Sequence, residues 1–458
     1  MEILFLIYHQ EGREEADFIT NIFDNVEEEI GLSISRRSDL YQAILFHLFS
    51  LLDENSTVGV ITSNSWLGTI AGQEFFNALT YYYEIESILA SGSGKWFNNA
   101  DVVTTMLILK RKNTPTAPSD NTSISFGLIW KPLDEFTDED IDQVINSLLL
   151  KHSMSTNLLT FTTHKLSEIN KFLSFNLVLN ACFYDINWLL DLEEILCPIS
   201  QYFNVFRGMK TGQDEIYYIN NSDDIDNEYI GHIFKSAKTA KFLIAKPDTN
   251  SFVCNKTLSE LEALGHTKTL EWINRFKDNL NKSIPNKNTF WMNLGENRLS
   301  GSQNIRLFTG MNPDQRIFYG LLEEPSQINQ RAIGFEPLSS NINLELCHAL
   351  LNSAIGIFYV EATGFPKGLG ALDNRAENMK KIKMLNPSIL TNDKIERILN
   401  AFQPLLAREI LNTKEEYTRS DRLYFEQIVA DSFGYSNILE RIIKCILTMQ
   451  EVRSSVRQ

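Results

Sequence analysis

Four lysines follow one another in the middle of this chain with no acidic residue between them: Lys235, Lys238, Lys241 and Lys246. The chain of 458 residues is otherwise acidic, with 42 basic against 58 acidic side chains and a formal net charge of −16. A protein with this balance does not attract polyanions over its whole surface, so a nucleic-acid face must be a local basic patch. The lysine run suits contact with phosphate groups. A solvated face without a ligand is the alternative.

A shorter segment before the lysines, residues 206–214, suits the same chemistry. It carries Arg207, Lys210 and Thr211 together with two glycines. Glycine lets a backbone approach a phosphate closely, and the three side chains can donate hydrogen bonds to it. An ordinary β-hairpin is the alternative. A second basic stretch follows the lysine run: Arg275, Lys277, Lys282 and Lys287.

The aromatic pair Trp96 and Phe97 stands between a Gly/Ser turn at residues 91–94 and a predicted strand at residues 102–110. Further upstream, a buried strand is predicted at residues 58–61. The chain then leaves the strand through Thr-Ser-Asn-Ser-Trp-Leu, and a helix is expected to begin near Gly72. Ser38-Asp39-Leu40-Tyr41 stands at the head of another predicted helix, with Ser38 or Asp39 as its N-cap.

Together these stretches resemble the second half of the catalytic domain of DNA adenine-N6 methyltransferases, as found in Type I and Type IIG restriction-modification systems. The match is to an apolar strand ending in Ile-Thr-x-Asn-x-Trp, followed by Phe-x-x-Ala-x-Val-x-Thr ahead of a final strand. The family's Asp-Leu-Tyr precedes both, and residues 39–41 resemble it.

The resemblance implies a role in base stacking for Phe97, with Trp96 beside it. An enzyme that methylates adenine N6 must extract the base from the duplex, and the extruded base needs a flat apolar partner. Stacking on an aromatic ring supplies roughly 1 to 3 kcal/mol per base. The alternative is that Phe97 is a core residue.

Resemblance resumes at residues 206–214, which are similar to the Gly-x-x-Thr-Gly segment that opens the family's target recognition domain. Residues 351–353, 364–372 and 385–387 resemble the end of such a domain, where Lys367 stands between glycines. The DNA contacts implied in this way share a basic or hydrogen-bonding side chain: Arg207, Lys210, Thr211, Lys235, Lys238, Lys241, Lys246 and Lys367.

We therefore expect an α/β protein with a partial Rossmann-like, largely parallel methyltransferase sheet, followed by a mixed α+β DNA target recognition domain and C-terminal helices. Residues 1–112 would form the second half of the catalytic domain and residues 113–201 a connecting α/β segment. Residues 202–390 would form the target recognition domain and residues 391–458 the helical region.

The family's Asn/Asp-Pro-Pro-Tyr/Phe motif and glycine-rich cofactor loop are not found in the sequence. The resemblance thus implies a split enzyme, in which this chain binds double-stranded DNA and a partner methyltransferase subunit holds S-adenosylmethionine. A restriction endonuclease would be a further partner. A non-catalytic DNA-recognition subunit and an inactive truncated product are the alternatives.

Five scattered cysteines show no Cys-x-x-Cys spacing, which indicates reduced core residues and no zinc site. We expect no metal. Because no apolar run approaches a membrane span or a signal-peptide core, a soluble intracellular protein is expected. The resemblance to restriction-modification enzymes implies the cytoplasm of a bacterium or archaeon, with association to the nucleoid.

Overall fold

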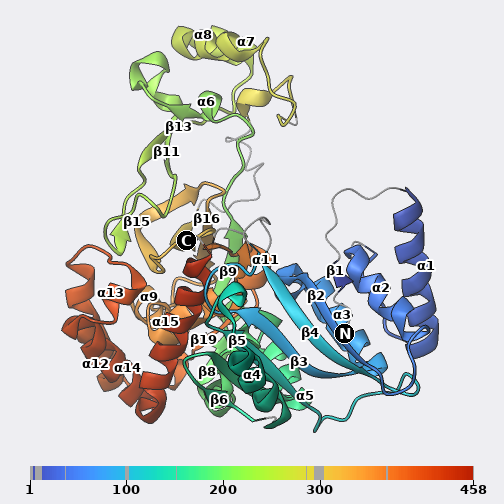
Figure 1. The fold of residues 1–458 in the computed structure, drawn as a ribbon. Coiled ribbons are helices and arrows are strands. Elements are labelled where there is room, and N and C mark those ends of the chain that lie inside the picture. The colour runs from blue at the N-terminus through green and yellow to red at the C-terminus, as the bar shows by residue number, and fades with distance from the viewer. Residues whose placement is uncertain are drawn as a thin grey trace. The chain divides into compact units, whose positions relative to one another are not determined.

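The computed structural model describes residues 4–5, 13–36, 38–97, 103–150, 152–284, 286–292, 304–367 and 370–456. The chain divides into two compact units, each built from separate segments. The first unit contains Met1–Glu194, Phe358–Asp373 and Asn437–Gln458, and the second contains Ile195–Ile357 and Asn374–Ser436. Figure 1 labels many of the helices and strands of both units.

A seven-stranded sheet forms the centre of the first unit, in the order β1-β2-β4-β3-β5-β7-β6. Its strands are β1 (Leu4–Phe5), β2 (Thr57–Ser63), β3 (Tyr83–Ser91), β4 (Thr104–Arg111), β5 (Ser123–Ile129), β6 (Met154–Ser155) and β7 (Leu159–Lys165). The predicted strands at residues 58–61 and 102–110 are confirmed as β2 and β4. Strands β5 to β7 lie beyond residue 112 and extend the same sheet. The predicted domain boundaries stay predictions.

The expectation of a largely parallel sheet is wrong. Among the described residues, β1 pairs with β2 and β3 with β5 in parallel, whereas β4 runs antiparallel to both β2 and β3, and β7 runs antiparallel to both β5 and β6. The chain turns back from β3 into β4 with no crossover helix in the described part of the connection. Parallel pairing needs such a crossover, so these neighbours are antiparallel.

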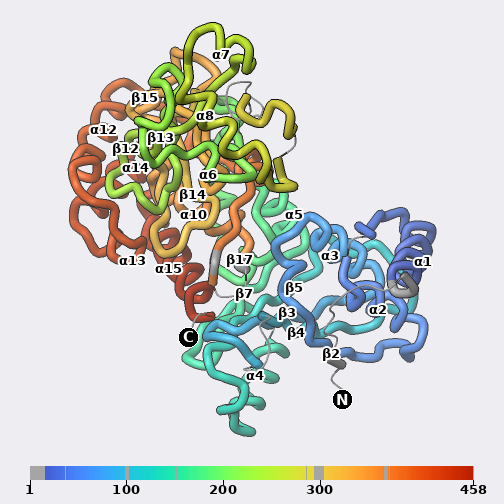
Figure 2. Tube along the Cα trace, turned by 90° about the horizontal axis from the view of Figure 1, so that it is seen from above, coloured from blue at the N-terminus to red at the C-terminus, as the bar shows by residue number. Residues whose placement is uncertain are grey.

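Three helices lie against one another in the first unit (Figures 1 and 2): α1 (Arg13–Ile30), α2 (Leu40–Phe49) and α3 (Ile70–Tyr82). The helix expected near Gly72 is confirmed as α3, and the helix headed by residues 38–41 is confirmed as α2. Their core consists of aromatic rings in edge-to-face contact, with ring centroids 5.1 Å apart for Phe46 and Tyr82 and 5.9 Å apart for Phe46 and Phe75. This geometry adds about 0.5–1.5 kcal/mol per pair to the burial of the rings.

The remaining helices and strands of the first unit complete its core. They are α4 (Asp138–Leu150), α5 (Leu166–Ser174), β17 (Phe365–Lys367), β18 (Ala371–Asp373), α15 (Leu439–Ser455) and the last part of α10 (Ala354–Thr363). The β17–β18 hairpin packs so closely that a Cβ at Gly68 would lie 1.9 Å from the Phe365 ring. Position 68 therefore accepts only glycine without movement of the hairpin.

The second unit contains an eight-stranded mixed sheet in the order β10-β13-β11-β15-β14-β16-β9, with β12 paired to β15. Its strands are β9 (Phe203–Arg207), β10 (Tyr218–Ile219), β11 (Ile230–Phe234), β12 (Ile244–Ala245), β13 (Thr249–Phe252), β14 (Ile305–Gly310), β15 (Tyr319–Ile328) and β16 (Ala332–Pro337). A separate pair joins β8 (Leu196–Pro198) to β19 (Lys383–Leu385).

The helices of the second unit are α6 (Asp214–Tyr217), α7 (Leu258–Leu264), α8 (Thr267–Phe276), α9 (Leu344–Leu351), α11 (Ala376–Met379), α12 (Asn392–Leu406), α13 (Thr413–Glu416) and α14 (Ser420–Phe433). Figure 1 shows α12 and α14 side by side. A strand-rich mixed region followed by helices confirms the predicted α/β fold class.

The five cysteines are buried free thiols, as expected for core residues. Within the described parts of the chain, no single helix is long and apolar enough to cross a membrane. One bent pair, α9 with α10, meets the requirement by length and composition only.

Candidate functional site

The chain leaves the end of β2 in a turn fixed by its own hydrogen bonds. Ser63 Oγ accepts from the Ser65 N–H at 3.2 Å and so starts the 3-10 helix η1 (Asn64–Gly68). The Asn64 N–H donates to the Val103 carbonyl at 2.9 Å, directly ahead of β4. The Asn64 side chain is thereby placed at the carboxyl end of β2.

Two of the recognised motifs meet at this turn. Ser65 Oγ donates a hydrogen bond of 3.3 Å to Asp39 Oδ2. Asp39 occupies the N-cap position of α2, as predicted, but its side chain makes no cap hydrogen bond to that helix. Its carboxylate therefore joins α2 to the turn after β2.

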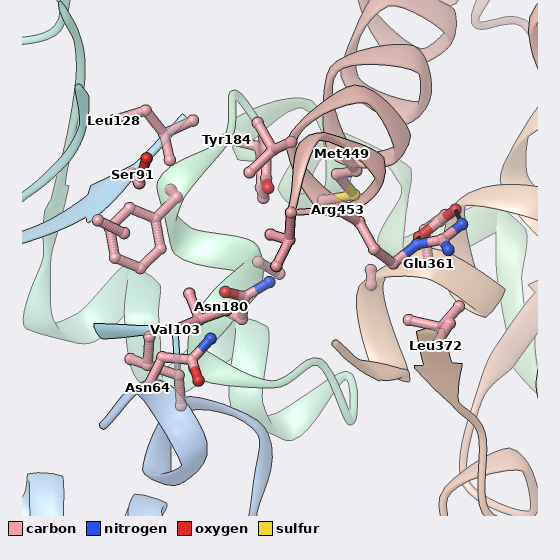
Figure 3. A pocket seen from close by; sticks show the side chains of 17 residues that line it. Asn64, Ser91, Val103, Leu128, Asn180, Tyr184, Glu361, Leu372, Met449 and Arg453 are labelled. Carbon is pink, nitrogen blue, oxygen red and sulfur yellow. Dashed lines mark hydrogen bonds and ion pairs between the residues drawn. The ribbon is translucent and has the colours of Figure 1, made fainter. Parts of the chain in front are cut away.

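A cavity of about 50 Å³ lies beside Asn64, and all of its lining residues belong to the first unit. Figure 3 shows its polar lining, which comes from three separate elements: Asn64 of η1, Ser91 of β3 and Asn180 of η3 (Leu179–Phe183). Each of these side chains can both donate and accept hydrogen bonds. Such a set can hold a small polar group or ordered water at the end of the sheet.

The opposite wall of the cavity carries a buried ion pair. The Arg453 guanidinium donates to both Glu361 oxygens, from Nε at 3.0 Å and from Nη2 at 2.6 Å, and the two side chains are only 3% and 2% exposed. A third donor, Nη1, bonds to the Gly370 carbonyl at 2.9 Å. Tyr184 lines the same cavity, and burial raises the pKa of its phenol, so it stays neutral.

A cofactor the size of S-adenosylmethionine does not fit this cavity. Sites for ligands of that class usually enclose about 300–1,000 Å³. The cavity beside Asn64 holds about 50 Å³. Among the described residues no cluster of three or more His, Cys, Asp or Glu side chains is arranged to hold a metal ion.

The predicted stacking residues lie near this end of the sheet, after β3. Trp96 is half-buried against a cluster that contains Leu89, Val144 and Phe161, and its Nε1 has no hydrogen-bond partner among the described residues. Phe97 is also half-buried and is the last described residue before position 103. Trp96 thus has the environment of a core residue, and the stacking role of Phe97 stays a prediction.

In the second unit, the glycines of residues 206–214 pack against their own chain. A Cβ on Gly208 would lie 2.0 Å from the Asn329 carbonyl oxygen. Gly212 has a φ of +82°, which favours glycine. Thr211 is buried, and its hydroxyl donates to the Asp214 carboxylate. These features are structural requirements of the fold.

The basic side chains of the same segment are accessible. Lys210 is exposed, and so is Arg207 at the end of β9, where its Nη2 donates to Gln330 Oε1 at 3.4 Å. Both can therefore reach a ligand in solution without disturbing the sheet.

The four lysines of the run are all exposed. Lys235 Nζ lies 4.7 Å from the Tyr218 ring centroid, and Lys246 Nζ forms an exposed ion pair of 3.2 Å with Glu323. Exposed pairs of this kind contribute at most about 1 kcal/mol, so phosphate can displace the carboxylate at little cost. The side chain of Lys367, the last predicted DNA contact, lies outside the described residues.

Asn180, Tyr184, Glu361 and Arg453 were not predicted as site residues. One sequence feature pointed to Glu361, because it is the single charged residue within the apolar helix Ala354–Thr363. The others carry no comparable pattern, because their place depends on contacts between segments distant in the chain.

No protein-family model matches this chain. Its fold is similar to that of the Type IIL restriction-modification enzyme MmeI, solved in complex with DNA, with 12% identity and a TM-score of 0.54 over 97% of this chain and 56% of that one. The type IIG restriction endonuclease BpuSI matches with 10% identity and a TM-score of 0.46 over 96% of this chain and 52% of that one.

A methyltransferase subunit of a type I restriction-modification system from Streptococcus thermophilus matches with 19% identity and a TM-score of 0.27, over 33% of this chain and 32% of that one. The structural neighbours are thus restriction-modification enzymes and their methyltransferase subunits. The chain spans about half the length of MmeI and BpuSI.

Proposed function

We propose that this chain belongs to a site-specific DNA adenine-N6 methyltransferase of a restriction-modification or related defence system, in which it supplies target recognition and the base-flipping half of the catalytic domain. The observation that carries the proposal is the contact between Asp39 and Ser65. This contact joins the motif at residues 39–41 to the motif at residues 61–66. Asn64, next to Ser65, is held by its backbone hydrogen bond to the Val103 carbonyl. The fold shared with MmeI supports the same conclusion.

In this proposal Phe97 stacks on the extruded adenine, and Trp96 anchors the segment that carries Phe97 to the apolar cluster beside it. The exposed cations of the second unit contact the phosphates of double-stranded DNA. A partner subunit holds S-adenosylmethionine and supplies the Asn-Pro-Pro-Tyr-type motif. A restriction endonuclease is a further partner. The complex acts in the cytoplasm of a bacterium or archaeon.

Selection from a random duplex library tests recognition by the isolated chain. We expect one sequence to be enriched, and replacement of its target adenine by 2-aminopurine should give a rise in fluorescence when the base leaves the stack. Calorimetric titration should detect no S-adenosylmethionine binding by the chain alone. A library that shows no enrichment, or saturable micromolar binding of the cofactor, would contradict the proposal.

The second candidate is a non-catalytic recognition subunit of a restriction or defence complex. The packing of Trp96 against a core cluster favours it, because an aromatic side chain held in the core does not stack on an extruded base. It predicts the same enriched sequence but no 2-aminopurine signal at any adenine, with partner chains present or absent.

A further inference from the structure

The second unit contains a cavity of about 640 Å³, to which the proposed function assigns only Lys238, as a phosphate contact. It is lined by the turn after β11, the turn from β14 to β15, the residue before β16 and the segment that joins α12 to α13. All of these segments belong to the second unit. Sites for small ligands usually enclose about 300–1,000 Å³, so this cavity has room for a nucleotide.

Three cations surround the cavity: Lys238, Arg316 and Arg331. Lys238 and Arg331 are exposed, and neither side chain forms an ion pair with another described residue. Arg316 is held in place, because its Nη2 donates to the Ala240 carbonyl and its guanidinium lies 5.5 Å from the Phe318 ring centroid. In a chain of net charge −16, this grouping favours a phosphate.

The rest of the lining suits a base more than a second phosphate. Asp314 and Glu415 bring carboxylates to the wall, and such groups accept hydrogen bonds from the exocyclic amino groups of bases. Ile410 and Leu411 are half-buried and offer an apolar surface to the face of a ring. Thymine has no exocyclic amino group, so the only base donor that it offers the carboxylates is its ring N3–H.

We propose that this cavity binds a single nucleotide whose base carries an exocyclic amino group, with the phosphate at Lys238 and Arg331 and the base against Ile410 and Leu411. An unpaired nucleotide of DNA and a free mononucleotide present the same chemistry. The inference goes beyond the proposed function, because it requires no methyl transfer.

Calorimetric titration of the full chain with dAMP, dCMP, dTMP and inorganic phosphate tests the inference. We expect saturable binding of dAMP or dCMP and an affinity for dTMP that is lower by about fivefold or more, the loss expected when one base-edge contact is missing. Inorganic phosphate should bind more weakly than either. Equal affinity for dTMP, or for phosphate alone, would overturn the assignment of the base.

Two variants test the phosphate contacts. Arg331→Gln and Lys238→Gln should each weaken dAMP binding by about tenfold, because each removes a charge-assisted hydrogen bond. Lys268→Gln, an exposed change on α8 outside the cavity lining, should leave it unchanged. The altered side chains are exposed, so melting temperatures should stay equal and loss of binding can be assigned to the cavity.

A competition experiment separates the two sources of the nucleotide. Displacement of dAMP by a duplex with one bulged nucleotide supports a nucleotide of DNA, and DNA binding without displacement supports a free mononucleotide. Absence of saturable binding for every nucleotide up to about 10 mM, or unchanged dAMP affinity in Arg331→Gln, would overturn the inference. Methylation plays no part in these measurements, so their failure leaves the proposed function standing.

Discussion

The Gly94 N–H donates a hydrogen bond of 2.8 Å to Ser455 Oγ, across a separation of 361 positions in the chain. Gly94 belongs to the turn that leads from β3 to Trp96 and Phe97, and it has a φ of +76°. Ser455 is the last residue of α15. The end of this helix therefore fixes the segment on which the proposed stacking residue stands.

Loss of this hydrogen bond should expose the amide of Gly94. Ser455→Ala removes the acceptor, so we expect faster hydrogen exchange in the peptide that spans residues 92–97, because local opening no longer breaks that bond. Mass spectrometry of deuterated protein measures the rate. Ser454→Ala is the matched control and should leave exchange unchanged. Equal exchange in both variants would show that α15 does not restrain the turn.

The ion pair between Arg453 and Glu361 should matter to stability far more than a surface pair. Arg453→Met leaves a buried carboxylate without its cation, which costs about 3–5 kcal/mol in the free energy of unfolding. Urea denaturation measures the loss. Lys171→Met breaks an exposed pair with Glu193 and should cost at most about 1 kcal/mol. Similar losses in both variants would contradict this account.

Phe97→Ala and Trp96→Ala should affect different properties of the protein, methylation in the first case and stability in the second. Because Trp96 packs half-buried against the apolar cluster, its loss should lower the free energy of unfolding, and with it the melting temperature, by at most the cost of a core truncation, about 3–5 kcal/mol. Phe97→Ala should instead lower the methylation rate of the assembled complex about 5-fold to 150-fold, which corresponds to the loss of roughly 1 to 3 kcal/mol of stacking. Sequence-specific DNA binding should be retained. A Phe97→Ala protein that melts far lower and loses DNA binding would place Phe97 in the core.

DNA binding should depend on the exposed lysines of the second unit. Replacing Lys210, Lys238 and Lys241 by glutamine should weaken binding and reduce the slope of log affinity against log salt by about one unit per lost phosphate contact. Fluorescence anisotropy at several salt concentrations measures the slope. Lys171→Gln is the control in the first unit. A slope that stays the same in the triple variant would place the DNA elsewhere.

His348 should make stability fall in acid. Burial lowers the pKa of its imidazole to about 4, although Nε2 hydrogen-bonds the Tyr319 carbonyl at 2.9 Å. The unfolded chain, with a pKa near 6.5, therefore takes up the proton first, so stability is full above about pH 6.5 and declines as pH falls toward 4. The total loss is about 3 kcal/mol.

Denaturation of His348→Gln at pH 7 and pH 4.5 measures this contribution. The variant keeps a hydrogen-bond donor but has no titrating ring, so its stability should change less between the two pH values than that of the parent protein. A parent and a His348→Gln variant with the same pH dependence would exclude His348 as its source.

The sequence by itself determined the local structure of this protein. Apolar runs and turn residues predicted helices α2 and α3 and strands β2 and β4, because side chains that recur at the helical or strand period must bury one face. The end of β2 was predicted less well, because the strand continues through Thr62 and Ser63 instead of ending at Ile61. Strand direction was not determined, since it depends on the partner that each strand meets in space.

Only the tertiary structure brought Asp39 to Ser65, Arg453 to Glu361 and Ser455 to Gly94. These contacts join segments that are separated by up to 361 positions, and no periodic pattern marks their members in advance. Their energy becomes available only after the intervening chain has closed, so the choice of partners belongs to the packed fold and not to any local stretch.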